Sequence, residues 1–176
     1  MINSETLKIA TTQKGDSVLD ISNKAPVLLT FLRHFGCIFC REALHDLADR
    51  KQSITDANIT LVLVHMSDNS IADQYLKDYN LPNVQHISDP ECTLYSVFGL
   101  TKSGPSELLG LKNLIRGFEL TVKRRAKPSF RYIGDGFQMP GIFMIDKGNV
   151  VDRFVHLSAS DRPDYDQMIR KVSTSK

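Results

Sequence analysis

Two runs of β-forming residues constrain the fold of this chain more than any other feature. The runs are PVLLTFLRHF (26–35) and NITLVLVHMSD (58–68). Neither alternates strictly between apolar and polar side chains, which is typical of strands buried on both faces of a sheet. Between them, REALHDLADRKQSI (41–54) places apolar side chains at helical spacing along one face. This order predicts two parallel strands joined by a helix in a right-handed crossover.

The rest of the chain predicts further helices and strands around this unit. Helix patterns cover residues 70–82, 90–100, about 105–127 and 162–176. Pro82 would end the first of these helices, and Pro90 lies near the first turn of the second. Strand patterns cover residues 85–89, the two halves of a hairpin over 141–157, and a short edge strand or hairpin over 13–25, while 128–139 is predicted to be a loop. The chain is therefore predicted to be α/β, with a central mixed sheet flanked by helices.

Composition limits the class of protein. With 176 residues, of which 41% are hydrophobic and 24% charged, residues 1–176 are predicted to form one globular domain. No apolar run reaches the roughly 18 residues of a membrane span, and the polar N-terminus does not resemble a secretory signal. We therefore expect a cytoplasmic protein.

The charge pattern argues against a nucleic-acid partner. The net charge is only +2, although residues 112–131 carry seven basic side chains against the single Glu119. This basic stretch is interpreted as a solvated helix face, with a docking surface for an acidic partner as the alternative.

A Cys-x-x-Cys pair lies at the junction between the first strand and its helix. Cys37 is placed just before a helix N-terminus, whose free N–H groups and dipole stabilise a thiolate. Arg33, His34 and Arg41 would add positive charge, whereas Glu42 would act weakly against it. Cys37 is therefore the predicted nucleophile, and Cys40, across the first helical turn, would attack a disulfide formed on Cys37.

Two other interpretations of the pair remain open. A structural zinc site needs about four ligands, and the sequence has no second cysteine pair or His-x₃₋₅-His to complete one. The thiols would otherwise be inert core residues. Cys92 is interpreted as a core residue, with a second resolving thiol as the alternative.

A strand, Cys-x-x-Cys, a helix, and a proline before a hairpin resemble the thioredoxin fold. The segments RHFGCIFCREAL, SDPECTLYSVFGL, GDGFQMPGIFMIDKGNVVDRFVH and SASDRPDY resemble the peroxiredoxin-like AhpC/TSA family, to which selenoprotein L-like proteins are related. The resemblance covers most of residues 13–170. It implies a thioredoxin-like fold with an extra N-terminal strand or hairpin and a helical insertion before the C-terminal hairpin. It also implies a cis Met139–Pro140 bond facing the cysteines, with the Met139 backbone available to a substrate.

The chain also departs from the family pattern. His34 and Thr30 stand where peroxiredoxins carry a threonine and a proline, and Pro140 stands where they carry an arginine. Phe31 replaces the buried acid of thioredoxins, which leaves the proton acceptor for Cys40 unassigned. His156 is expected at the same end of the sheet as Cys37, either as a proton shuttle or as a structural residue.

Asp161 and Arg162 follow His156 in the chain. They are expected either to pair with each other or to cap the last helix.

These features predict a thiol-disulfide oxidoreductase with Cys37 as nucleophile and Cys40 as resolving thiol. A thiol peroxidase with Cys37 peroxidatic is the alternative, and a redox-sensing binding module without turnover is an alternative of another class. The substrate would be a protein disulfide or a peroxide, and a thioredoxin- or glutaredoxin-type protein would return the reduced dithiol. No metal or organic cofactor is implied.

Overall fold

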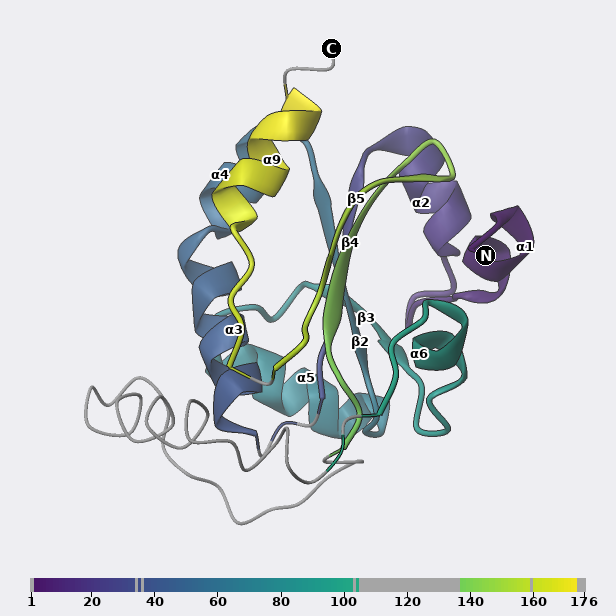
Figure 1. Ribbon diagram of the computed structural model, residues 1–176. Coiled ribbons are helices and arrows are strands. Elements are labelled where there is room, and N and C mark those ends of the chain that lie inside the picture. Colours follow the sequence, from purple (N-terminus) through teal and green to yellow (C-terminus); the bar gives the residue numbers. More distant parts are fainter. Residues whose placement is uncertain are drawn as a thin grey trace.

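One mixed five-stranded sheet forms the centre of the molecule (Figure 1). The computed structural model describes residues 2–33, 35, 37–102, 104, 137–158 and 160–173. Its strands lie in the order β3-β2-β1-β4-β5. They are β1 (Val27–Phe31), β2 (Thr60–His65), β3 (Gln85–Ser88), β4 (Gly141–Asp146) and β5 (Asn149–Val155).

The central strand is β1, as the uninterrupted apolar run predicts. All five of its residues are buried, and it pairs in parallel with β2 and antiparallel with β4. β2 pairs in parallel with β3, and β4 forms the predicted hairpin with β5. The parallel crossover, the hairpin and the mixed sheet are thereby confirmed.

Helices cover both faces of the sheet (Figure 1). One face packs against α3 (Ile38–Asp49), α4 (Lys51–Asp56), α5 (Asn69–Asp78) and α9 (Tyr165–Ser173). The other face packs against α1 (Ser4–Ile9), α2 (Val18–Lys24) and α6 (Thr93–Val97). No helix among the described residues is both long and apolar enough to cross a membrane.

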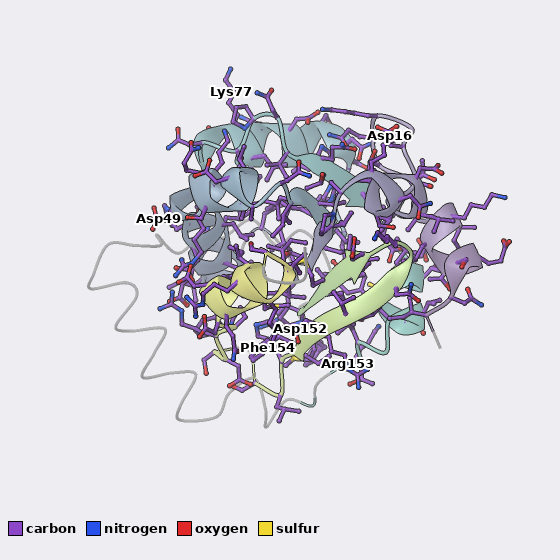
Figure 2. All side chains as sticks on the ribbon, turned by 90° about the horizontal axis from the view of Figure 1, so that it is seen from above. Asp16, Asp49, Lys77, Asp152, Arg153 and Phe154 are labelled. Atoms are coloured by element: carbon purple, nitrogen blue, oxygen red, sulfur yellow. The ribbon has the colours of Figure 1, made fainter. Side chains whose placement is uncertain are left out.

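The side chains of β5 alternate between the two faces of the sheet, as expected for a strand. Figure 2 shows Asp152 and Phe154 on the side of α9 and Arg153 pointing away from it. Asp152 accepts a hydrogen bond from Lys171 of α9 at 2.9 Å, and Phe154 packs against the α9 side of the core. His156 lies two residues after Phe154, so its side chain is directed to the same face, toward α3 and α9.

The structure corrects three expectations of local structure. Residues 18–24 form α2 instead of an edge strand, because Ser17 caps the helix by accepting from the Asp20 N–H at 3.1 Å. The helix after β3 begins at Thr93, and the carboxylate of Asp89 accepts its first N–H groups. α5 ends four residues before Pro82, where Asn80 takes a left-handed φ of 60°.

Some expectations fall outside the described residues. They include the helix over 105–127, most of the loop over 128–139, and the basic stretch over 112–131. The helical insertion and the alternative docking surface therefore stay predictions, as does the single domain.

Candidate active site

The cysteine pair lies at the carboxyl end of β1, where the chain turns into α3. Cys37 is the N-cap residue of α3, and Cys40 lies in its first turn. Both cysteines are free and buried, and their side chains are joined by a hydrogen bond. Cys37 has extended backbone angles (φ −73°, ψ 128°), as is usual for an N-cap residue. The backbone N–H groups of Phe39 and Cys40, in the first turn of the helix, help to lower the pKa of the Cys37 thiol.

Arg33 contacts both sulfur atoms through different groups. Its backbone N–H donates to Sγ of Cys40 at 3.2 Å, and its Nη1 lies 3.7 Å from Sγ of Cys37. The residue is buried, with 5% of its surface exposed. A buried guanidinium beside a sulfur favours the thiolate form of that sulfur.

The two thiols differ in acidity. The hydrogen bond from Cys40 lowers the pKa of Cys37 to about 6, against the opposing effect of burial, and the charge of Arg33 lowers it further. Burial raises the pKa of Cys40 well above its usual range, and the hydrogen bond to Cys37 raises it further. At neutral pH Cys37 is therefore mainly a thiolate, whereas Cys40 is a thiol that donates to it.

The segment before β4 closes one side of the site. The Met139–Pro140 bond is trans, contrary to the expectation of a cis bond. The trans form is the more stable one for a bond to proline. The segment is held by the Met139 N–H, which donates to Thr101 at 3.1 Å, and by the Pro140 carbonyl, which accepts from the His156 N–H at 3.4 Å.

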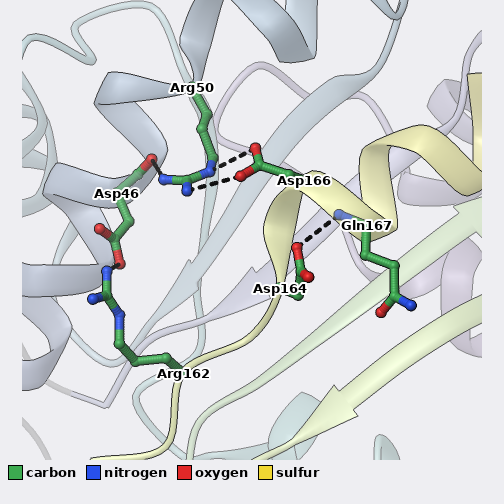
Figure 3. Close-up of polar contacts among 6 residues, drawn as sticks. All are labelled: Asp46, Arg50, Arg162, Asp164, Asp166 and Gln167. Carbon is green, nitrogen blue, oxygen red and sulfur yellow. Dashed lines mark hydrogen bonds and ion pairs between the residues drawn. The ribbon is translucent and has the colours of Figure 1, made fainter.

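A cluster of charged side chains lies on the α9 side of the site. Glu42 and Asp46 of α3 are buried, and Arg162 bridges them, with Nη1 3.4 Å from Glu42 and Nη2 bonded to Asp46. Arg50 holds Asp166 through two hydrogen bonds of 2.9 and 3.0 Å (Figure 3). Arg162 thereby joins α3 to the segment before α9, and Arg50, the C-cap of α3, joins the end of α3 to the first turn of α9.

This cluster corrects the expected roles of Asp161 and Arg162. The carboxylate of Asp161 accepts from the N–H groups of Leu157 and Ser158, so it caps the turn after β5. The last helix is instead capped by Asp164, which accepts from the Gln167 N–H at 2.8 Å (Figure 3).

A comparison with protein families identifies the chain. The sequence model of the family described as AhpC/TSA antioxidant enzyme matches residues 46–160. The chain belongs to this family. The resemblance read from the sequence motifs is therefore confirmed. The matched range begins after Cys40, so the roles of the two cysteines depend on their geometry.

Curated AhpC/TSA relatives support this membership. Peroxiredoxin-like 2C of Homo sapiens and of Bos taurus are each 28% identical to the chain over 137 residues, which is 73% of this chain and 59% of the relative. The chain thus spans 59% of the length of these relatives.

Solved structures show the same thioredoxin-like fold at low sequence identity. Peroxiredoxin 6 of Arenicola marina has a TM-score of 0.64 at 12% identity, with 94% of this chain and 68% of that one covered. Peroxiredoxin Q of Xanthomonas campestris has a TM-score of 0.63 at 11% identity, with 94% and 90% covered. A protein described as the thiol:disulfide interchange protein DsbE of Chlorobium tepidum has a TM-score of 0.59 at 16% identity, with 93% and 91% covered.

The structure brings most, but not all, of the site residues expected from the sequence together. Arg33, Pro140 and His156 surround the cavity beside Cys40. The Arg41 Nε donates to the Phe35 carbonyl at 3.2 Å, which braces the loop before Cys37. His34 lies outside the described residues.

Cys92 lies away from the cysteine pair. Its Sγ is 3.3 Å from Sδ of Met66, and it packs against the opposite face of the sheet from Cys37. This position favours the interpretation of Cys92 as part of the core.

Several residues of the site region were not singled out by sequence reasoning. Asp46 lies four residues after Glu42 on α3, and both carboxylates face the buried side of the helix. Acidic residues on the otherwise apolar face of a helix were a readable signal, but their partner Arg162 comes from a distant segment. No group of three or more His, Cys, Asp or Glu side chains in the described part of the chain is arranged to hold a metal ion.

Proposed function

We propose that this chain is a thiol peroxidase in which Cys37 is the peroxidatic thiol and Cys40 the resolving thiol. The observation that carries this proposal is the Cys37 sulfur, with its pKa lowered to about 6, beside the guanidinium of Arg33. Membership of a family described as antioxidant enzymes supports a peroxide as substrate. We therefore favour the peroxidase over the thiol-disulfide exchange expected from the sequence.

The reaction follows from the ionisation states of the two thiols. The Cys37 thiolate attacks one oxygen of a hydroperoxide, the O–O bond breaks, and the other oxygen leaves with a proton as water or an alcohol. Cys37 is thereby oxidised to a sulfenic acid. Cys40 then attacks the Cys37 sulfur, a disulfide forms, and the sulfenic oxygen leaves as water. A thioredoxin- or glutaredoxin-type dithiol in a reducing, cytoplasmic compartment would return the pair to the reduced state.

Arg33 can replace the arginine whose absence from the sequence argues against a peroxidase. The chain has Pro140 where the family usually carries an arginine. The guanidinium of Arg33 reaches the Cys37 sulfur from the end of β1 and would stabilise the negative charge on the departing oxygen. A buried cation is thus available from a different position.

Thiol-disulfide exchange is the second candidate. It is favoured by the hydrogen bond between the two thiols of the Cys-x-x-Cys pair, which places the resolving thiol next to the nucleophile. The same Cys37 thiolate would then attack a protein disulfide instead of a peroxide.

Rapid-mixing measurement of hydrogen peroxide consumption by the reduced protein separates the candidates. We expect consumption much faster than by free cysteine at the same pH. Cys37→Ser should abolish it, whereas Cys40→Ser should allow one turnover and leave a sulfenic acid that dimedone traps. Cys92→Ser is the control and should leave the rate unchanged. A rate no faster than that of free cysteine would reject the peroxidase and leave disulfide exchange.

A further inference from the structure

A small, partly open cavity of about 30 Å³ lies between the sheet and α3, beside Cys40. Its walls include Thr30 of β1, Cys40 of α3, and His156, which follows β5. A cavity holds a water molecule when it offers about 10–15 Å³ of this volume and two to four polar partners. The cavity is therefore large enough for one or two waters.

The wall includes buried polar atoms of Thr30, His156 and Arg33. Thr30 Oγ1 and His156 Nδ1 are both buried without a hydrogen-bond partner among the described residues. Thr30 is the polar residue of the apolar strand VLLTF and is 2% exposed. A buried hydroxyl without a partner is destabilising, and a bridging water would supply the missing hydrogen bond. These atoms therefore indicate a polar ligand the size of water.

Cys40 needs a proton acceptor, and a water at this position could carry its proton. In the proposed function Cys40 must lose its proton when it attacks the sulfur of Cys37, and its buried thiol has a raised pKa. Phe31 at the end of β1 offers no proton acceptor. The acceptor must therefore come from another part of the cavity wall.

We propose that a water in this cavity bridges Thr30, His156 and Cys40, and carries the Cys40 proton to His156 as the Cys37–Cys40 disulfide forms. This inference rests on the proposed function of the pair. The S–S bond forms as the Cys40 S–H bond and the S–O bond of the Cys37 sulfenic acid break. The proton held by His156 then neutralises the departing hydroxide, so that water is the product.

His156 is in the right state to accept this proton. Burial lowers its pKa to about 4, so the imidazole is neutral at neutral pH. The charge of Asp161 partly offsets this lowering of the pKa and would stabilise the imidazolium, whereas the charge of Arg33 acts against it. When Cys37 becomes a sulfenic acid it loses its negative charge, which removes one of the causes that raise the pKa of Cys40.

Other ionisable groups also line the cavity and were weighed as acceptors. They are Arg33, Glu42, Asp46, Asp161, Arg162 and Tyr165. The two buried carboxylates, Glu42 and Asp46, are both held in ion pairs by Arg162, so their oxygens are already engaged. Asp161 is engaged by two backbone N–H groups. The imidazole of His156 is therefore the acceptor that the geometry favours.

The test measures the resolving step without peroxide. One equivalent of 5,5′-dithiobis(2-nitrobenzoic acid), added to the reduced full chain carrying Cys92→Ser, releases one thionitrobenzoate when Cys37 attacks and a second when Cys40 resolves. We expect Thr30→Val and His156→Gln to leave the first release within about twofold and to slow the second about tenfold or more. Thr30→Ser, which keeps the hydroxyl, should restore the second release.

The pH profile separates a proton relay from a loss of packing. In His156→Gln the second release should rise about tenfold per pH unit between pH 6 and 8, because Cys40 must ionise on its own, whereas the parent chain should rise less steeply. The controls are Ser67→Ala, another buried hydroxyl without a described partner but outside this cavity, and the exposed His45→Gln. Both should leave the second release unchanged.

The outcomes decide between the assignments. An unchanged second release and pH profile in both cavity variants, or equal slowing in the controls, would overturn the relay. Slowing by Glu42→Gln but not by His156→Gln would transfer the role to the carboxylate and overturn the assignment to His156. Slow peroxide consumption would reject the peroxidase alone, since the two-step release follows Cys40 whichever substrate oxidises Cys37.

Discussion

The guanidinium Nη1 of Arg33 lies 3.7 Å from the Sγ of Cys37. Arg33→Gln removes this charge, and we expect the pKa of Cys37 to rise from about 6 by about one unit. The thiolate fraction at pH 7 would then fall from about nine-tenths to about one half. The rate of iodoacetamide alkylation as a function of pH measures this change. Arg41→Gln is the matched control, and a shift as large in this variant would show that general positive charge, not Arg33, activates the thiol.

The hydrogen bond from Cys40 is the largest cause that lowers the pKa of Cys37. Cys40→Ala removes the donor, whereas Cys40→Ser keeps one at the same position. We therefore expect the pKa of Cys37 to rise more in Cys40→Ala than in Cys40→Ser, and more than in Arg33→Gln. The same alkylation profiles provide the measurement. Equal pKa values in the two Cys40 variants would contradict a role for this hydrogen bond.

The ion pairs of Arg162 predict a loss of stability when the cation is removed. Arg162→Met leaves the buried carboxylates of Glu42 and Asp46 without their shared partner. We expect a loss of about 2 kcal/mol, less than for a fully buried pair because the Arg162 side chain is 42% exposed.

Arg50→Met is the matched control, because it breaks the more exposed pair with Asp166 and should cost less than about 1 kcal/mol. Urea unfolding measures the free energy of unfolding of both variants. Similar losses for the two arginines would mean that the carboxylates of α3 do not need Arg162.

A buried histidine pair predicts lower stability in acid. His65 Nε2 lies 2.8 Å from His86 Nδ1, and His86 Nε2 lies 3.0 Å from Asp73 Oδ1. Burial lowers the pKa of His65 from 6.5 to about 3, and His86 lowers it further. Between these pH values the unfolded chain binds a proton that the folded chain does not. The free energy of unfolding should therefore fall by up to about 1.4 kcal/mol per pH unit as pH drops below 6.5, from this residue alone.

Comparison of urea unfolding at pH 7.5 and 5 checks this prediction. His65→Gln has no ionisable group at this position, so its stability should fall less between the two pH values. An equal fall in the parent chain and in His65→Gln would show that other groups cause the acid sensitivity.

The strands β1, β2 and β4 could be predicted because they are apolar runs that the packed chain must bury. The N-terminal segment could not be predicted by the same rule. Residues 13–25 were predicted to form a short edge strand or hairpin, but Val18 and Ile21 are one helical turn apart, and both are buried in α2. The capping pattern of Ser17 with Asp20 was the signal that distinguishes the two structures.

The sequence by itself determined the order of strands and helices and the position of Cys37 at a strand-to-helix junction, because these depend on neighbours along the chain. The tertiary structure decided what surrounds the cysteines. Thr30, Cys40 and His156 meet at one cavity only because β1, α3 and the end of β5 pack together. Contacts between segments more than 100 residues apart depend on that packing, which no local pattern in the sequence encodes.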